Sequence, residues 1–170
     1  MRALIFGLLL LAALFARAAA EPYKFDALGF EVAFPVEPEV SAGEIEAPSG
    51  PTKVTRFRAW SGDLRASLTV IQYSFEEFNP DDLGKALDAS REQQLAQSGG
   101  RLVSESDLAV DGGAGREFVI EVTHNGQIAH YRVRTIYLRN RQYLQSVIGS
   151  PDEVRTDAAE AYFASFRAWN

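Results

Sequence analysis

The 170-residue chain contains no cysteine, two histidines and a single methionine. Without cysteine it can form no disulfide and can carry no lipid on a cysteine behind a leader. It also contains neither the Gly-x-Ser-x-Gly turn of a serine hydrolase nor a glycine loop with the Lys-Ser/Thr of a nucleotide-binding protein. These absences remove the most specific sequence signals of enzymatic function.

Residues 1–20 have the pattern of a targeting segment. Arg2 is followed by an apolar run and then by three consecutive alanines, as in a secretory signal peptide. We expect cleavage before Glu21, a single domain over residues 21–170, and an exported protein that is periplasmic or secreted. A membrane anchor is the alternative, but the run is shorter than the roughly 20 residues that span a bilayer. We therefore expect no stable membrane span after cleavage.

The charge of the chain excludes one class of partner. The whole sequence has 17 basic and 23 acidic residues, a net charge of −6. Removal of the leader takes away Arg2 and Arg17, which leaves 15 basic against 23 acidic residues, a net charge of −8. A domain of this charge repels phosphate backbones, so we expect no nucleic-acid partner.

The stretch from Gly115 to Gly149 predicts three consecutive antiparallel strands. Its first turn falls at Asn125-Gly126, the dipeptide that most readily places two successive residues at positive φ. A two-residue turn there fixes the register of the two flanking strands. On one face, which we interpret as core, it pairs Val122 with Ala129, Ile120 with Tyr131, and Phe118 with Val133. On the other face it pairs Glu121 with His130, Val119 with Arg132, and Glu117 with Arg134.

Two further turns predict two more hairpins. A turn at Asn140-Arg141 would pair Tyr137 with Leu144, Thr135 with Ser146, and Val133 with Ile148. A turn at Gly62-Asp63 would pair Ala59 with Ala66, Phe57 with Leu68, and Thr55 with Val70 on an apolar face. The opposite face of this hairpin is polar and carries Arg56 and Arg58, with Trp60 opposite Arg65. We also expect a short edge strand around Val40 to Ile45, in a segment that four prolines interrupt.

Two segments predict helices. Asn79-Pro80-Asp81-Asp82 supplies a cap, a proline at the first helical position and carboxylates in the first turn, and Gly99-Gly100 ends that helix. Ser150 to Glu153 is a capping box, followed by apolar residues at helical spacing up to Trp169. Strands, one helix, more strands and a second helix indicate an α+β domain, an antiparallel sheet of about six strands flanked by helices.

No group of residues has the spacing of a catalytic or metal-binding site. His124 and His130 lie in one hairpin but point to opposite faces, so we expect no shared metal ion. The glycine-rich residues 111–115 lead into a strand, which favours a tight connection over a phosphate site. Asp81 and Asp82 are explained by helix capping. We therefore assign no catalytic residue, no metal and no cofactor.

The polar face of the predicted sheet carries more arginine side chains than the fold needs for stability. Arg132 and Arg134 share one face, and Arg56 and Arg58 would join them if the two hairpins lie in one sheet. Such a face could hold an anionic small ligand or a carboxylate-bearing protein partner. The alternative is that Glu117, Glu121 and helix carboxylates neutralise these arginines as ordinary cross-strand pairs.

Several stretches resemble the PsbP-like family, which includes uncharacterised exported bacterial proteins. They are GFEVAFPVEP, LVSESDLAVDGGAGREFVIEV, HYRVRTIYLRNRQYLQSVIG and the closing FASF. Family members show a Phe-Pro pair after the first strand, here Phe34-Pro35, and a Gly-Arg-Glu that opens a strand, here Gly115 to Glu117. They also show an Arg and two Tyr in the next strands, here Arg134, Tyr137 and Tyr143, and an aromatic-Ser-Phe stretch, here Phe163 to Phe166.

The resemblance implies an antiparallel sheet between helices, a fold also used by a photosystem II extrinsic subunit and a Ran-binding nuclear protein. Those relatives bind other proteins and are not enzymes. The resemblance therefore favours a non-catalytic binding or accessory module. One alternative is an envelope hydrolase whose site is assembled from scattered Asp, Glu, Tyr and His; another is a photosystem-associated subunit. The cyanobacterial members carry a lipid-anchoring cysteine that this chain lacks.

Overall fold

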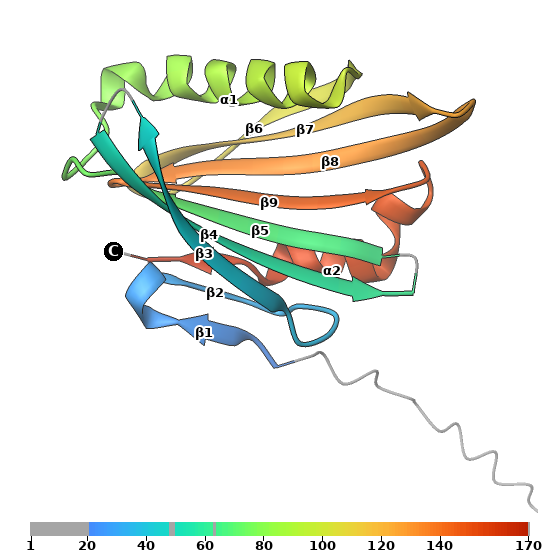
Figure 1. Ribbon diagram of the computed structural model, residues 1–170, viewed down its shortest axis with the longest axis horizontal. Helices are drawn as coiled ribbons and strands as arrows, with labels where there is room; N and C mark the ends of the chain where they lie inside the picture. Colours follow the sequence, from blue (N-terminus) through green and yellow to red (C-terminus); the bar gives the residue numbers. More distant parts are fainter. Residues whose placement is uncertain (1–20, 48–49, 63, 170) are drawn as a thin grey trace, which may run out of the picture.

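A computed structural model describes residues 21–47, 50–62 and 64–169, apart from the side chain of His124 (Figure 1). The predicted leader, residues 1–20, lies outside these ranges. The described residues form one seven-stranded sheet, one three-stranded sheet and two α-helices. The α+β class is confirmed, and the main sheet has seven strands where the sequence predicts about six.

All neighbouring strands of both sheets are antiparallel. Across the main sheet the order is β3 (Glu39–Ala47), β4 (Gly50–Ser61), β5 (Leu64–Gln72), β9 (Arg141–Gly149), β8 (Gln127–Leu138), β7 (Gly113–His124) and β6 (Arg101–Leu108). The second sheet consists of β1 (Tyr23–Phe25), β2 (Phe30–Val32) and β10 (Arg167–Ala168), with the 3-10 turn η1 (Asp26–Leu28) between the first two.

The hairpin of β7 and β8 has the predicted register. Asn125 and Gly126 take φ angles of 49° and 76°, and Phe118 lies opposite Val133 as expected. The β4–β5 hairpin also has its predicted register, with Phe57 opposite Leu68. The predicted edge strand is β3, which extends to Glu39–Ala47 and forms one edge of the main sheet.

The β8–β9 turn lies one residue earlier than predicted, which shifts the β9 partner of each β8 residue by two. It falls at Arg139-Asn140, so Tyr137 pairs with Gln142 and not with Leu144. The segment before α1 holds this turn: the backbone N–H of Phe78 donates to the carbonyl of Arg139 at 2.9 Å. Arg139 accordingly takes a φ of 54°. A shift of two leaves every side chain on its predicted face, because faces alternate with period two.

The first predicted helix is confirmed at both ends. The Asn79 side chain accepts a hydrogen bond from the N–H of Asp81 at 3.1 Å, and the 3-10 turn η2 (Pro80–Asp82) leads into α1 (Leu83–Ser98). Gly99 ends the helix at a φ of 63°. Left-handed backbone at this position is what glycine allows at low cost.

The second helix is shorter than predicted. Ser150 and Glu153 form the capping box, but it opens only the 3-10 turn η3 (Glu153–Arg155). The helix α2 (Asp157–Ser165) begins afterwards, with the Thr156 hydroxyl as its cap. It ends before Trp169 because the chain leaves to pair β10 with β2.

The two helices cover opposite faces of the main sheet (Figure 1), which we call the α1 face and the α2 face. On the α1 face, Phe118, Ile120 and Val133 are fully buried, which confirms the predicted core face. The larger core lies on the α2 face, between the main sheet, the second sheet and α2. Its fully buried large side chains include Phe30, Phe34, Phe57, Leu68, Tyr143, Tyr162 and Phe163.

Candidate ligand-binding site

Arg132 and Arg134 project from β8 into the α2 face, where they are engaged by protein groups. Glu117 of β7 lies 2.9 Å from the Arg132 guanidinium and 2.7 Å from that of Arg134, and Glu160 of α2 also pairs with Arg132. Both guanidiniums stack on the ring of Phe163. The sequence suggests a polar outer face here, which is wrong, because α2 packs over it and leaves Arg132 only 9% exposed.

Arg56 and Arg58 lie on the other face of the same sheet. Their hairpin does join the β7–β9 strands, through β5 and β9. The register of that contact places Leu68 opposite Gln145, and Gln145 opposite Arg134. Leu68 in turn pairs with Phe57. The residues that share the face of Arg134 are therefore the apolar ones, and the four arginines do not form the single predicted face.

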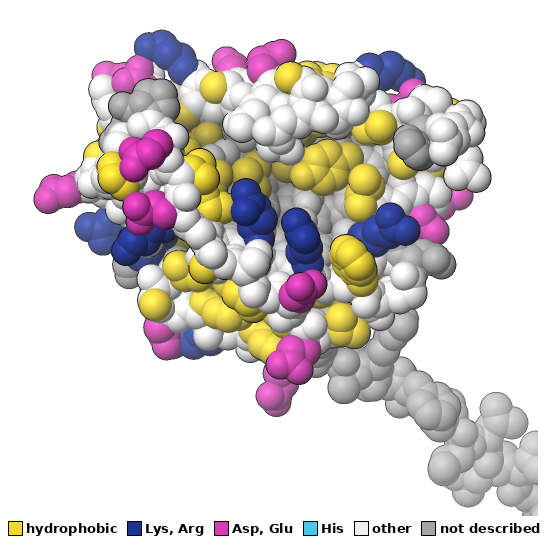
Figure 2. Space-filling view, viewed as in Figure 1, with side chains coloured by type: hydrophobic (Ala, Val, Ile, Leu, Met, Phe, Trp, Pro, Cys, Tyr) yellow, Lys and Arg dark blue, Asp and Glu magenta, His cyan; other side chains and the backbone are white. Residues whose placement is uncertain are grey.

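Arg56 and Arg58 are exposed, and no described residue forms an ion pair or hydrogen bond with either. Glu39 of β3 sits opposite Arg58 in the register, yet it is not close enough for an ion pair. One strand further, Arg65 of β5 lies opposite Trp60, which is 68% exposed. We call Arg56, Arg58, Arg65 and Trp60 the arginine surface. Figure 2 shows basic side chains gathered in a hollow on this face, below α1.

Ion pairs with β6 and β7 hold α1 over one side of its face. Arg116 of β7 donates to Asp88 of α1 at 2.6 Å, and Arg91 of α1 donates to Glu105 of β6 at 2.8 Å. The hydrogen bond from Arg116 lowers the pKa of Asp88 below its ordinary value. Because α1 is anchored at this edge, the side of the face formed by β4 and β5 remains uncovered, and the arginine surface lies there.

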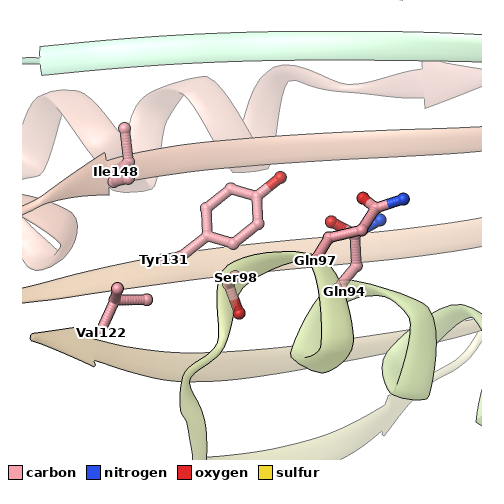
Figure 3. A pocket seen from close by; sticks show the side chains of 6 residues that line it. All are labelled: Gln94, Gln97, Ser98, Val122, Tyr131 and Ile148. Carbon is pink, nitrogen blue, oxygen red and sulfur yellow. The ribbon is translucent and has the colours of Figure 1, made fainter.

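A pocket of about 290 Å³ lies where the end of α1 meets the sheet. Its lining consists of Gln94, Gln97, Ser98, Val122, Tyr131 and Ile148 (Figure 3). The first three come from α1 and form a polar wall, whereas the last three come from β7, β8 and β9 and form an apolar floor. Burial raises the pKa of the Tyr131 hydroxyl, so this group is neutral at physiological pH.

The pocket and the arginine surface are neighbours on the sheet. In one cross-strand row Tyr131 lies opposite Ile148, and Ile148 lies opposite Arg65. Arg65 then faces Trp60. Directly opposed residues of antiparallel strands are about 5 Å apart at Cβ. Arg65 is therefore only one strand away from Ile148, the pocket-floor residue opposite it.

The other sequence candidates have structural roles. His130 lies beside Glu121 as the predicted register requires, with 3.8 Å between Nε2 and the nearer carboxylate oxygen, and it is buried. The register places His124 opposite Gln127, on the other face of the hairpin. Among the described residues no three His, Asp or Glu are grouped to hold a metal ion. At Gly113 an added Cβ would lie 2.2 Å from the Tyr137 carbonyl oxygen, so the glycine-rich loop is a tight connection.

Comparison with known structures supports the fold. Cyanobacterial PsbP (CyanoP) from Synechocystis sp. PCC 6803 has a similar solution structure, with a TM-score of 0.58 and 14% sequence identity over 89% of this chain and 94% of that chain. A Pseudomonas aeruginosa protein of unknown function, PA94, described as a putative regulator, shares 12% identity over 79% of this chain and 85% of its own, with a TM-score of 0.39. No family model and no curated protein matches the sequence. The similarity to CyanoP bears out a PsbP-like fold, and at this identity it concerns the fold alone.

Proposed function

We propose that this PsbP-like fold serves as a non-catalytic accessory module that binds an anionic ligand on its α1 face, at the arginine surface. The observation that carries the proposal is the state of Arg56 and Arg58. Both are exposed, neither has a described ionic partner, and they lie in a chain with a net charge of −6. Arg132 and Arg134 of the α2 face, in contrast, are neutralised by glutamates of the protein itself.

The geometry of the arginine surface suits an anion. Arg56 and Arg58 alternate with a buried Phe57, so their side chains leave the same face about 7 Å apart along β4. A guanidinium presents a planar set of donors that matches a carboxylate or a phosphate. Trp60, next but one along the strand, adds an exposed aromatic ring to the same surface.

The lining of the neighbouring pocket supports a binding role over a hydrolytic one. The six lining residues are amides, a serine, two aliphatic side chains and a tyrosine. None of them is a carboxylate or a histidine, which are the usual general bases of hydrolases. An accessory role also agrees with the similarity to CyanoP. We propose in addition that the protein is exported, on the pattern of residues 1–20.

Isothermal titration of the purified protein with inorganic phosphate, a dicarboxylate and an alkyl phosphate tests the proposal. We expect at least one of these anions to bind, with an affinity that falls as salt is added. The double variant Arg56→Gln/Arg58→Gln should lose this binding. Arg167→Gln is the matched control, because Arg167 is an exposed arginine of β10, in the second sheet and outside the arginine surface. Equal binding by the double variant, or no binding of any anion, would overturn the proposal.

A further inference from the structure

We infer that the ligand is an amphiphilic anion, whose apolar chain occupies the pocket under the end of α1 while Arg65 and Arg58 hold its carboxylate or phosphate headgroup. This inference rests on the proposed function and specifies the chemical class of the ligand. It follows from three observations on the α1 face: the composition of the pocket, its position relative to the arginines, and the polarity of the helix above it.

The pocket floor is suited to an apolar chain. Val122, Tyr131 and Ile148 present aliphatic and aromatic carbon to it, and Ile148 is 37% exposed. It is one of eight large hydrophobic side chains that are exposed among the described residues. Covering such surface is favourable in proportion to the apolar area removed from water. A purely hydrophilic anion would leave this floor open to water.

A positively charged side chain, Arg65, lies next to the pocket. Arg65 lies opposite Ile148 in the β5–β9 register, so a chain lying on Ile148 reaches a guanidinium one strand away. Arg58 is the diagonal neighbour of Arg65 on the same face, at about 7 Å. The charge of Arg65 acts on the carboxylate of Glu153, whose own hydrogen bonds come from Ser150, and no described residue forms an ion pair or hydrogen bond with Arg65 or Arg58. Both arginines therefore remain available to a headgroup.

The helix above the pocket sets the direction of the ligand. Gln94, Gln97 and Ser98 belong to the last turns of α1, where the helix dipole is negative, and no basic residue compensates it there. An anionic group is disfavoured at that end and favoured at the arginine end. The chain thus lies under α1 with the headgroup pointing toward β5 and β4. Figure 3 shows the two glutamine side chains beside the Tyr131 ring at the pocket wall.

The test compares probes that have a tail, a charge or both, by isothermal titration of the purified protein. Decanoate and decyl phosphate carry both, butyrate and inorganic phosphate carry the charge, and decyltrimethylammonium carries the tail with the opposite charge. Each is used below its micelle-forming concentration. We expect decanoate and decyl phosphate to bind most tightly, with about a fourfold gain for each methylene group that becomes buried.

Two matched pairs of variants locate the two ends of the ligand. Ile148→Gln should weaken decanoate about fivefold and leave phosphate unchanged, whereas Ile128→Gln, an exposed isoleucine on the α2 face, should change neither. Arg65→Gln should weaken both probes, and Arg167→Gln, at an exposed arginine of β10, should weaken neither. Val122→Thr, which keeps the shape of the side chain, repeats the tail test with a second floor residue.

The outcomes separate this inference from the function on which it rests. Butyrate binding as tightly as decanoate, or decanoate binding unaffected by Ile148→Gln and Val122→Thr, would overturn the amphiphile while leaving an anion site at the arginines. Equal binding of decyltrimethylammonium would overturn the headgroup assignment. If no anion binds at all, the proposed function itself is wrong.

Discussion

The guanidinium carbon of Arg132 lies 4.5 Å from the centre of the Phe163 ring, so that a side chain of the main sheet stacks on one of α2. Glu117 and Glu160 pair with the same guanidinium from the sheet and from the helix. Its Nη1 also donates to the carbonyl of Val154, at 3.3 Å. Arg132 thus fastens η3 and α2 to the sheet.

The first prediction concerns this fastening. Arg132→Gln should lower the free energy of unfolding by about 2 kcal/mol, because it removes the charged hydrogen bonds to Glu160 and one of the two guanidiniums that pair with Glu117. Urea unfolding followed by circular dichroism measures the change. Arg58→Gln, at an exposed and unpaired position, should stay within about 0.5 kcal/mol of the parent protein. Equal stability of the two variants would show that Arg132 is not a structural residue.

The second prediction concerns the β8–β9 turn. Arg139 takes a φ of 54°, a region that costs a side-chain-bearing residue energy and costs glycine little. Arg139→Gly should therefore stabilise the protein by about 0.5 kcal/mol. This is the difference between the relief of the left-handed backbone strain and the larger conformational entropy that glycine has in the unfolded chain. Arg139→Val should destabilise it, since a branched side chain tolerates this region poorly. Thermal melts of both variants test the order, and a more stable valine variant would contradict it.

The third prediction is a pH dependence at the capping box. The backbone N–H of Ser150, and then its hydroxyl, lower the pKa of Glu153 below its usual 4.5. A carboxyl group with a lowered folded-state pKa adds stability that is complete above its unfolded pKa and is lost as the pH falls through the folded pKa. Glu153→Gln should therefore flatten the decline of Tm below about pH 4.5. Glu76→Gln, in the exposed segment before α1, provides the reference curve; coincident curves for the two variants would refute the assignment.

The fourth prediction tests export. When the full chain is produced in a Gram-negative bacterium, the protein should be recovered from the periplasm or the medium with Glu21 as its first residue, because the small residues before it suit a signal peptidase. Intact-mass measurement of the purified protein detects the loss of residues 1–20. Substitution of Ala18 and Ala20 by bulky residues should block processing. A cytoplasmic protein of full mass would contradict the expectation.

Local signals were sufficient where the turn residues alone determine the backbone. Asn125-Gly126 supplies both positive φ angles, and the whole β7–β8 register followed correctly from it. The β8–β9 turn was misplaced because hydrogen bonds from Tyr73 and Phe78, distant in the sequence, select Arg139 for positive φ. No local pattern predicts such a contact. The same holds for the second sheet, in which β2 pairs with a strand from the other end of the domain.

The candidate site was predicted only in part. The alternation of polar and apolar residues along β4 places Arg56 and Arg58 together on its polar face, and the structure confirms that both are exposed. Their separation from Arg132 does not follow, because it depends on β5 pairing with β9 in one particular register. Whether Arg132 faces water or a helix also depends on where α2 packs. The pocket was missed because its floor residues are brought together by three strands and carry no motif.

The covering of the α2 face has a consequence for how the chain is made. Leu68 and its strand β5 are synthesised early, yet α2 (residues 157–165), which packs on β5 and donates a hydrogen bond from Tyr162 to the Ser67 carbonyl, comes about ninety residues later. During translation this hydrophobic surface remains exposed to solvent until α2 has been synthesised. The nascent polypeptide therefore keeps apolar surface exposed on this side until late in synthesis, a state that a chaperone can bind.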